Sequence, residues 1–268
     1  MKTPHHEEDT SWENSAKPYH ELVGNKGSYY HQHIIFPRAL ALLNLTGYSS
    51  LLELGCGQGV FSRVIPENIT YFGLDKSPTL IALAKSMQKK KPLVANVVAP
   101  QDEKKPYFKI QDVSVPFKLA KTNFTHAVII LALQNMPSFE TAIANASAHL
   151  KPGGKLLIVL NHPSFRIPKH SSWVMEPYTQ SRRIHRYMEQ FSIPIDMTPG
   201  SQDQATMTWS FHAPLSAYSA VFYKHNLLIE KIEEWVSDKT SVGKNADREN
   251  KARAEFPLFM GILLVKRD

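Results

Sequence analysis

The sequence lacks the cysteines for an internal disulfide and the long apolar run of a membrane-spanning helix. Cys56 is the single cysteine among 268 residues, so no disulfide can form within the chain. The longest apolar run, AVIILAL from Ala127 to Leu133, has the length of a buried strand and falls far short of the roughly 18 residues of a membrane-spanning helix. The N-terminal stretch MKTPHHEEDT contains no apolar segment of the secretory type. We therefore expect a cytoplasmic protein that does not insert into a membrane.

The positive charge of the chain is not concentrated in one place. The net charge is +7, which is compatible with nucleic acid, an acidic substrate or an anionic membrane surface as partner. The densest basic run, KSMQKKK at residues 85–91, ends a predicted helix, where cations interact favourably with the helix dipole. No tract interleaves basic and aromatic residues, so nucleic acid is not the favoured partner. His5 and His6 adjoin acidic residues, but a polar tail explains them, and no metal site is predicted.

Between residues 34 and 160 the sequence alternates between helical and extended patterns. The extended patterns are SLLELG, TYFGLD, YFKIQDV, THAVIILAL and KLLIVL. Ser77 and Ser138 are predicted helix N-caps, and VFSRVI, after the first extended pattern, is predicted to begin a helix. Alternation of this kind indicates an α/β fold of Rossmann type, a mostly parallel sheet with helices on both faces.

The alternation stops after Leu160. Residues 161–206 are rich in proline, serine, arginine and aromatic residues, and QSRRIHRYMEQF within them is predicted to be helical. A loop-rich insertion in an α/β domain is usually a binding segment, so we interpret residues 161–206 as a substrate lid. The regular pattern resumes with TMTWSF (strand), PLSAYSAVFYKHN (helix), LLIEKIEEW (strand) and PLFMGILLVK (strand).

A glycine-rich turn follows the first predicted strand. LLELGCGQG, residues 51–59, spaces its glycines as G-x-G-x-G and carries Glu53 in front, whereas the dinucleotide fingerprint is G-x-G-x-x-G. A carboxylate repels a pyrophosphate but attracts a cationic amino acid moiety. S-adenosylmethionine carries an ammonium and a sulfonium and has no phosphate, so this turn favours it over a nicotinamide dinucleotide.

Two further acids end the next strands. Asp75, about 20 residues after the first glycine, is placed to accept both ribose hydroxyls, a feature that nicotinamide and adenosylmethionine sites share. Asp112 is placed to accept the adenine amino group, and Val113 to supply an apolar contact or a backbone donor.

Taken in order, these motifs resemble the class I S-adenosylmethionine-dependent methyltransferases. LLELGCGQG, YFGLDKS, IQDVSVPF, HAVIILALQNM and LKPGGKLLIV follow the order and spacing of that family, and LALQNMP is similar to the segment after strand four in its quinone-type branch. One departure is His126, where many members carry aspartate. The resemblance implies a seven-stranded, mostly parallel sheet closed by an antiparallel last strand. It divides the chain into an N-terminal tail and cofactor-covering segment, residues 1–45, and a methyltransferase domain, residues 46–268.

The resemblance also implies roles for individual residues. Glu53 and the carbonyl of Leu131 would hold the methionine ammonium, the glycines would line the methionine and ribose, and Asp75 would bind the ribose diol. Cys56 lies in the turn and is expected to face the sheet, so we do not assign it a nucleophilic role. The predicted cofactor-binding residues are Tyr30, Glu53, Gly55, Cys56, Gly57, Gly59, Asp75, Lys76, Asp112, Val113 and Leu131.

The segment GNKGSYYHQHIIFP precedes the helix that leads into the first strand. In many family members such a segment folds over the cofactor, where aromatic rings gain about 1–2 kcal/mol from contact with a sulfonium. We predict such contacts for Tyr30 and His31 and a substrate contact for Tyr29. The alternative is that these rings pack against the edge of the sheet.

Methyl transfer depends mainly on holding the two reactants in line, so no fixed triad is expected. Asn161 and His162 follow strand five, at the edge where ligands of such sheets bind, and we predict a substrate contact and a general base there. Arg166 is a candidate to bind an acidic acceptor. His212 and His31 are the other candidate catalytic histidines.

These observations predict methyl transfer from S-adenosylmethionine to a small molecule, aromatic or quinone-like, because an enclosing lid suits a small acceptor. Three alternatives stay open: an RNA methyltransferase, a noncatalytic adenosylmethionine-binding protein and a nicotinamide enzyme. The sequence does not fix the oligomeric state.

Overall fold

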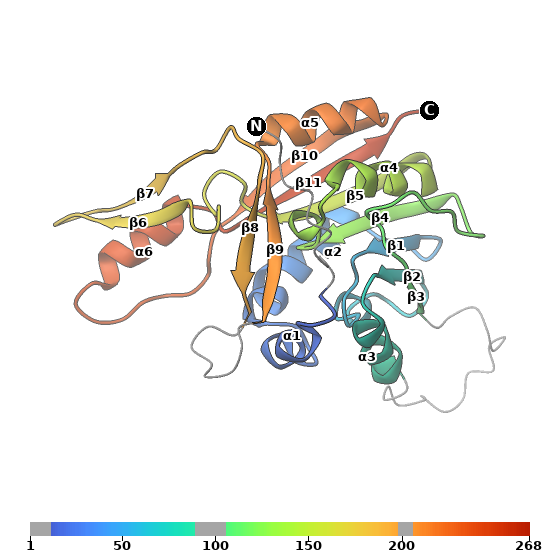
Figure 1. Ribbon diagram of the computed structural model, residues 1–268, viewed down its shortest axis with the longest axis horizontal. Coiled ribbons are helices and arrows are strands. Elements are labelled where there is room, and N and C mark those ends of the chain that lie inside the picture. Colours follow the sequence, from blue (N-terminus) through green and yellow to red (C-terminus); the bar gives the residue numbers. More distant parts are fainter. Residues whose placement is uncertain (1–11, 89–105, 198–205) are drawn as a thin grey trace.

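A seven-stranded sheet forms the centre of the computed structural model, which describes residues 12–88, 106–197 and 206–268 (Figure 1). The strands of this sheet are β1 (Ser50–Leu54), β2 (Thr70–Asp75), β3 (Tyr107–Ile110), β4 (Phe124–Ile130), β5 (Leu150–Asn161), β10 (Leu227–Trp235) and β11 (Phe259–Lys266). Their order is β10-β11-β5-β4-β1-β2-β3. The strands β1 to β5 pair in parallel, and β11 runs antiparallel to both of its neighbours, β5 and β10. The predicted mostly parallel sheet with an antiparallel last strand is confirmed.

Helices cover both faces of the sheet. The helices of the described residues are α1 (Ala16–Val23), α2 (Phe36–Leu43), α3 (Pro78–Gln88), α4 (Phe139–His149), α5 (Leu215–Lys224) and α6 (Ala246–Glu255), of which α6 lies beyond the sheet; short turns are η1 (His31–Ile35), η2 (Phe61–Arg63) and η3 (Leu133–Asn135). Side chains of α2 and α3 pack with Leu51 in one core, whereas those of α4 and α5 pack with Leu52 in the other. Successive residues of β1 thus face opposite layers, as strand geometry requires.

The predicted caps begin two of these helices. The Ser77 hydroxyl accepts a hydrogen bond from the backbone N–H of Leu80 at 3.1 Å, and Ser138 accepts from Thr141 at 3.3 Å. Each bond satisfies a backbone donor that has no partner within its helix. None of the described helices has the length and apolar character needed to cross a membrane.

Three local predictions are wrong. VFSRVI forms only the single turn η2, because Pro66 follows closely and disfavours helical geometry in the residue before it. Residues 12–20 are not a tail, since α1 begins at Ala16. QSRRIHRYMEQF is not a helix: it supplies β7 (Gln180–Ile184), which pairs antiparallel with β6 (Ser171–Met175), and then turns at Arg186, whose φ is +58°.

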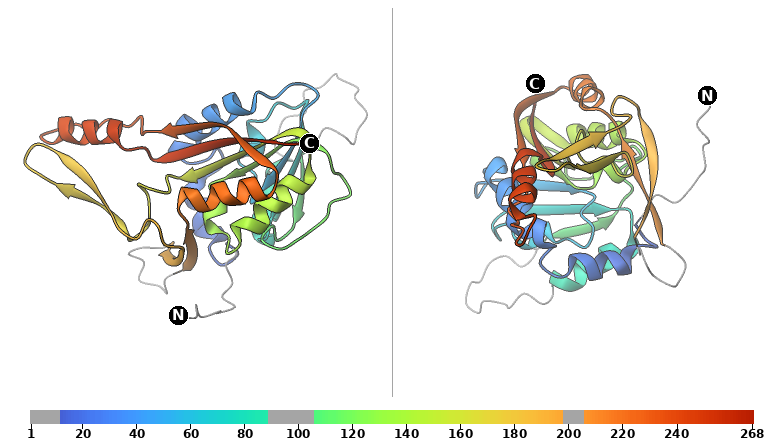
Figure 2. Two further views of the ribbon diagram at one scale, coloured as in Figure 1. Left: turned by 90° about the horizontal axis from the view of Figure 1, so that it is seen from above. Right: turned by 90° about the vertical axis from the view of Figure 1, so that its left-hand side faces the viewer.

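The predicted lid is built from two hairpins. The β6–β7 hairpin lies beside α6, where the Arg248 guanidinium donates to the Glu176 carbonyl at 3.0 Å, and together they project beyond the sheet (Figure 2). We call β6, β7 and α6 the arm. The second hairpin pairs β8 (Phe191–Asp196) with β9 (Met207–His212). The predicted lid boundary at residue 206 therefore falls between two paired strands, so from here on the lid means the described residues 162–197 and 206–212, which include β9.

Candidate functional site

A cavity of about 340 Å³ opens where the carboxyl ends of the parallel strands meet, the usual position for ligands of such sheets. The sheet side contributes Gly55, Gly57, Asp75, Lys76, Leu80, Asp112, Val113, Ser114, Ile130, Leu131, Ala132, Gln134, Asn135, Met136 and Asn161. The N-terminal segment contributes Trp12, Tyr19 and His31, and the lid contributes Pro168, Ile195, Thr208 and Ser210. Residues from three distant parts of the chain therefore enclose one space.

The glycine turn is held against β2. The backbone N–H groups of Gly55 and Cys56 both donate to the Leu74 carbonyl, at 2.8 and 2.9 Å. A Cβ on Gly55 would lie 2.5 Å from the Cβ of Ala132, and one on Gly59 would lie 2.8 Å from the ring of Phe108. Glycine is thus required at these two positions for close packing within the protein, in addition to any approach by a ligand.

Two residues of the turn lie away from the cavity lining. Gly59 packs against Phe108, as described above, and Cys56 is buried with its sulfur against β2, where a Cβ on Gly73 would come within 2.9 Å of it. Burial raises the pKa of the Cys56 thiol, which keeps it protonated and unreactive. The sulfur faces the sheet, the orientation expected from the sequence.

Asp75 ends β2 with its carboxylate in the cavity. One oxygen accepts from the backbone N–H of Gly57 at 2.8 Å, and the other from that of Ser77 at 2.9 Å. Burial raises the pKa of Asp75, and the two backbone hydrogen bonds oppose this effect by favouring the charged form. Each carboxylate oxygen keeps a further acceptor position, so the group can receive two hydroxyl donors.

The next strand end adds a second acid and a cation. The Asp112 carboxylate accepts from the backbone N–H of Ser114 at 2.8 Å and lies 3.3 Å from the ammonium of Lys76. Val113, beside them, is buried and presents an apolar contact to the cavity. This part of the wall combines the polar and apolar contacts that a purine needs.

Glu53 is buried behind the glycine turn and is not part of the cavity lining. The Tyr71 hydroxyl donates a hydrogen bond to its carboxylate. Burial raises the pKa of Glu53 to about 8, an effect that outweighs this hydrogen bond and is reinforced by the negative charge of Asp75. Near neutral pH the group is mostly protonated until a cation comes close to it.

The Leu131 carbonyl already has two partners. It accepts from the side-chain amides of Gln134, at 3.1 Å, and of Asn135, at 3.2 Å. A carbonyl oxygen has two lone pairs, so both are occupied. The expected contact with a ligand ammonium therefore competes with these two amides.

The N-terminal segment closes the cavity through residues that the sequence did not reveal. Trp12 and Tyr19 line the cavity and contact each other, with ring centroids 5.2 Å apart. The Glu13 carboxylate accepts from the backbone N–H of Thr79, at 3.1 Å, and so fastens this segment to the start of α3. The signal in the sequence that could have predicted α1 is Ser15 before a short helical pattern, although the Ser15 side chain makes no capping hydrogen bond.

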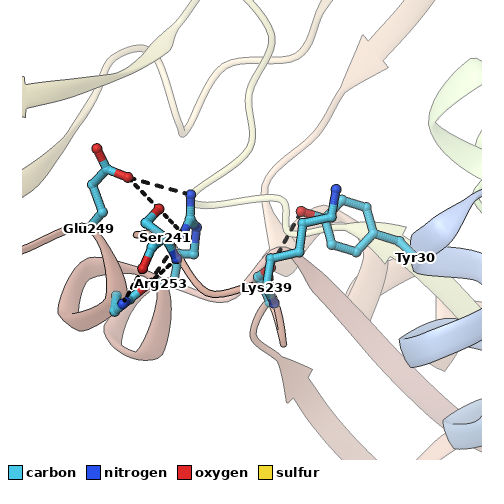
Figure 3. A network of polar contacts seen from close by, with 7 residues as sticks. Tyr30, Lys239, Ser241, Glu249 and Arg253 are labelled. Atoms are coloured by element: carbon cyan, nitrogen blue, oxygen red, sulfur yellow. Dashed lines mark hydrogen bonds and ion pairs between the residues drawn. The ribbon is translucent and has the colours of Figure 1, made fainter. Parts of the chain in front are cut away.

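Tyr29 and Tyr30 do not line the cavity. The Tyr30 hydroxyl lies 3.4 Å from that of Ser237, and its ring faces the ammonium of Lys239 at 5.0 Å (Figure 3). The Tyr29 ring stacks on His33 with centroids 4.2 Å apart. Both tyrosines therefore pack near the base of the arm, where Figure 3 also shows the polar network of Ser241, Glu249 and Arg253.

His31 lines the cavity as a hydrogen-bond donor. Its Nδ1 accepts from the backbone N–H of Ser28 at 3.1 Å, so the proton of the neutral ring is on Nε2. Burial lowers the pKa of His31 to about 4, which keeps the ring neutral. This tautomer has no vacant lone pair, and the geometry argues against His31 as a general base.

The other two candidate histidines lie outside the lining. His162 is 2% exposed; its Nδ1 accepts from the backbone N–H of Ser164 at 3.2 Å, and its Nε2 lies 2.7 Å from the Glu234 carboxylate. Burial lowers the pKa of His162. The Nε2 of His212 donates to the Tyr187 carbonyl at 2.8 Å. The contacts of both rings are structural, so the geometry does not favour the predicted base roles.

Of the predicted substrate contacts, Asn161 lines the cavity and Arg166 does not. The Arg166 guanidinium lies 5.8 Å from the centre of the Trp173 ring, next to Arg182, and its Nε is buried without a hydrogen-bond partner among the described residues. The lining residues Ile195, Thr208 and Ser210 were not predicted from the sequence. They lie on a hairpin, and the face of a hairpin that meets a cavity depends on how the hairpin packs against the rest of the fold.

The residues present fit S-adenosylmethionine. Asp75 offers paired acceptor positions for a ribose diol, Asp112 and Val113 offer polar and apolar contacts for adenine, and the buried Glu53 offers a counter-charge behind the turn. The seven-stranded sheet and the position of this cavity at its carboxyl edge have the arrangement expected of the class I methyltransferase fold.

Comparisons with known proteins agree. A family model described as a methyltransferase domain matches residues 27–215, more than half of the chain, and the chain belongs to this family. It is 27% identical over 117 residues to a ubiquinone biosynthesis O-methyltransferase of Coxiella burnetii; the match spans 43% of this chain and 45% of that protein, so less than half of the relative's length is covered.

Two solved structures illustrate the similarity of fold. An S-adenosylmethionine-dependent methyltransferase from Mesorhizobium loti superposes with a TM-score of 0.61 at 20% identity, covering 86% of this chain and 96% of that one. An S-adenosylmethionine-bound amino pentose methyltransferase from Micromonospora echinaspora gives a TM-score of 0.54 at 17% identity, covering 97% of this chain and all of the other.

Proposed function

We propose that the protein transfers the methyl group of S-adenosylmethionine to a small-molecule acceptor. The observation that carries the proposal is the single cavity that runs from the acids at the ends of β2 and β3 to the lid strands β8 and β9. A ligand held at Asp75 and Asp112 therefore shares one cavity with whatever contacts Thr208 and Ser210.

The bound cofactor supplies an electrophilic methyl carbon on a positively charged sulfur. The residues of this chain would bind and orient it: Asp75 would accept from the ribose, Asp112 and Val113 would contact the adenine, and the turn from Gly55 to Gly57 would line the methionine. Trp12, Tyr19 and His31, which line the same cavity, would limit the contact of the bound cofactor with water. Orientation alone supplies up to about 7–11 kcal/mol of barrier reduction in a favourable case, so the scheme needs no general base.

The similarity to a ubiquinone biosynthesis O-methyltransferase supports a small acceptor, although it covers less than half of either chain. The contribution of the N-terminal segment and the lid to the cavity lining supports it independently, because a site with walls on several sides suits a small molecule better than a polymer. The net charge of +7 gives the RNA alternative only weak support, because the basic residues are scattered and form no tract of the kind that binds RNA.

Replacement of Asp75 tests the cofactor site. Asp75→Ala should weaken binding of S-adenosylhomocysteine at least tenfold in calorimetric titration, because charge-assisted hydrogen bonds of about 1.5–3 kcal/mol are lost. Asp247→Ala in α6, away from the cavity, is the matched control and should bind with unchanged affinity. Equal affinity of the Asp75 variant and the original protein would remove this residue from the proposed site.

A further inference from the structure

Two arginines lie over the same aromatic ring of the arm. The guanidinium carbons of Arg166 and Arg182 are 5.8 and 5.0 Å from the centre of the Trp173 ring. Arg182 and Trp173 are directly paired residues of the β6–β7 hairpin, so their side chains leave the same face of it. Arg166 belongs to the segment between β5 and β6. Two separate parts of the chain therefore bring two positive charges to one place.

Neither guanidinium forms an ion pair with a described residue. Burial and the positive charge of Arg182 lower the pKa of Arg166 to about 10, and the described group that opposes them is the Tyr30 hydroxyl rather than a carboxylate. The carboxylate of Glu234 lies 2.7 Å from the Nε2 of His162 instead. Partly buried like charges without a counter-charge are unfavourable, so an anion that neutralises both would stabilise this arrangement.

The two guanidiniums keep accessible hydrogen-bond donors. Arg182 donates from Nε to the Phe165 carbonyl at 2.8 Å and from Nη2 to the Ser171 hydroxyl at 2.6 Å. Of the nitrogens of the pair, the Nε of Arg166 is the one that is both buried and without a partner. The Nη1 of Arg182 and both terminal nitrogens of Arg166 are therefore reached by solvent and have no partner in the described part of the chain.

The charge and shape of the pair fit a phosphate group. Two guanidiniums carry two positive charges, and a phosphate monoester carries about −1.5 to −2 at neutral pH. The planar guanidinium fork binds phosphate oxygens through paired hydrogen bonds. The rings of Trp173 and Phe256, with centroids 5.5 Å apart, add apolar surface for an organic group attached to the phosphate.

The pair does not belong to the cavity lining. Asn161 and Pro168, which come before and after Arg166 in the chain, both line the cavity, whereas neither arginine does. An anion at the pair therefore leaves free the position that the proposed function gives to the nucleoside, at Asp75 and Asp112.

We propose that Arg166 and Arg182 form a binding site for a phosphate group outside the cavity. The accessible nitrogens of the two guanidiniums donate to the phosphate oxygens, and the bound anion offsets the repulsion between the two cations. The phosphate is either free or part of an organic phosphate whose carbon portion contacts Trp173. This inference goes beyond the proposed function and does not depend on it.

Three probes test the site: inorganic phosphate, phenyl phosphate and phenol. Broadening of the ³¹P NMR signal measures binding of the first two, and saturation-transfer NMR measures binding of phenol. Both phosphate probes should bind saturably, and phenol should bind at least tenfold more weakly than phenyl phosphate, because it lacks the charge. Tighter binding of phenyl phosphate than of inorganic phosphate assigns the site to organic phosphates, and equal or weaker binding assigns it to the free anion.

Arg166→Gln tests the pair at little structural cost, because the Arg166 guanidinium makes no hydrogen bond with a described residue. It should weaken binding of both phosphate probes at least tenfold, since charge-assisted hydrogen bonds are lost. Arg183→Gln is the matched control, because Arg183 is exposed, pairs with Ser172 and leaves the opposite face of the hairpin. It removes the same charge beside Arg182 and should change probe affinity less than twofold. Circular dichroism and melting temperature report whether each variant is folded.

Absence of saturable binding of both phosphate probes, unchanged affinity of the folded Arg166→Gln variant, or equal losses in the two variants would overturn the assignment. Phenol binding as tight as that of phenyl phosphate would do the same, because the site would then recognise the ring rather than the charge. None of these measurements uses the methyl donor, so their outcome is separate from that of the proposed function.

Discussion

The protonation state of Glu53 in the structure differs from the one that the sequence predicts. Glu53 was predicted as a fixed negative charge beside the ligand ammonium, yet it is buried behind the glycine turn with a pKa of about 8. A carboxyl with a raised pKa releases its proton only when a cation approaches. Below pH 8, binding of a cationic ligand therefore includes the cost of removing that proton.

The affinity for S-adenosylhomocysteine should consequently rise with pH. Because the free protein holds the Glu53 proton below pH 8 and the complex does not, the association constant should increase roughly tenfold per pH unit between pH 6 and pH 7 and level off towards pH 8. Calorimetry in buffers of different ionisation enthalpy should report release of one proton. Glu53→Gln, which still accepts from Tyr71, should give a flat profile, and an equally steep one would assign the titration to another group.

The glycine turn and β3 show how one element constrains its neighbour. Gly59 has a φ of +73°, and a Cβ there would lie 2.8 Å from the Phe108 ring of β3. Gly153 has a similar φ of +68°, but a Cβ there would meet nothing within 4 Å. The two positions therefore share the backbone strain and differ in packing.

Gly59→Ala should lower the free energy of unfolding by about 2–4 kcal/mol, and Gly153→Ala by about 1 kcal/mol. The second value measures the left-handed backbone alone, and the difference measures the clash with Phe108. Urea unfolding of both variants tests this comparison. Equal losses would mean that the Phe108 ring moves aside at no cost.

Periodicity and caps were sufficient to predict the sheet. The extended patterns ending in Glu53-Leu54, Asp75 and Leu160 form the strands β1, β2 and β5 of the central sheet, and the caps Ser77 and Ser138 begin their helices, because these signals are local. The same local signals failed for residues 180–191. Their helical spacing is overridden by pairing with β6, a tertiary contact that the sequence pattern does not encode.

Prediction of the site was limited for the same reason. The cavity residues on the strand ends, such as Asp75 and Asn161, follow from their positions after apolar runs. Trp12 and Tyr19 belong to a segment that docks through the contact of Glu13 with α3, 66 positions away at Thr79. Thr208 reaches the cavity only because β9 packs against η3. Such packing depends on contacts between segments that are far apart in the sequence, and a local sequence pattern does not encode these contacts.

At the scale of the whole molecule, the cavity joins the N-terminal segment, the sheet edge and the lid. A ligand that contacts all three stabilises the folded state as a unit, because the unfolded chain has no such site. A comparison of which ligands stabilise the protein therefore tests the whole cavity at once, whereas a single substitution tests one residue of its lining.

S-adenosylhomocysteine at about 100 times its dissociation constant should stabilise the protein by about 2.7 kcal/mol, which corresponds to a rise of roughly 5–10 °C in the melting temperature. NADH at the same concentration should give no rise, because its pyrophosphate would lie next to the turn backed by Glu53, where any ionised fraction of the carboxyl repels it. Differential scanning fluorimetry measures both shifts, with Asp75→Ala as the control that should lose most of the first. A shift with NADH as large as that with S-adenosylhomocysteine would mean that the cavity has no preference for the sulfur-bearing nucleoside over a dinucleotide, and it would contradict the proposed cofactor.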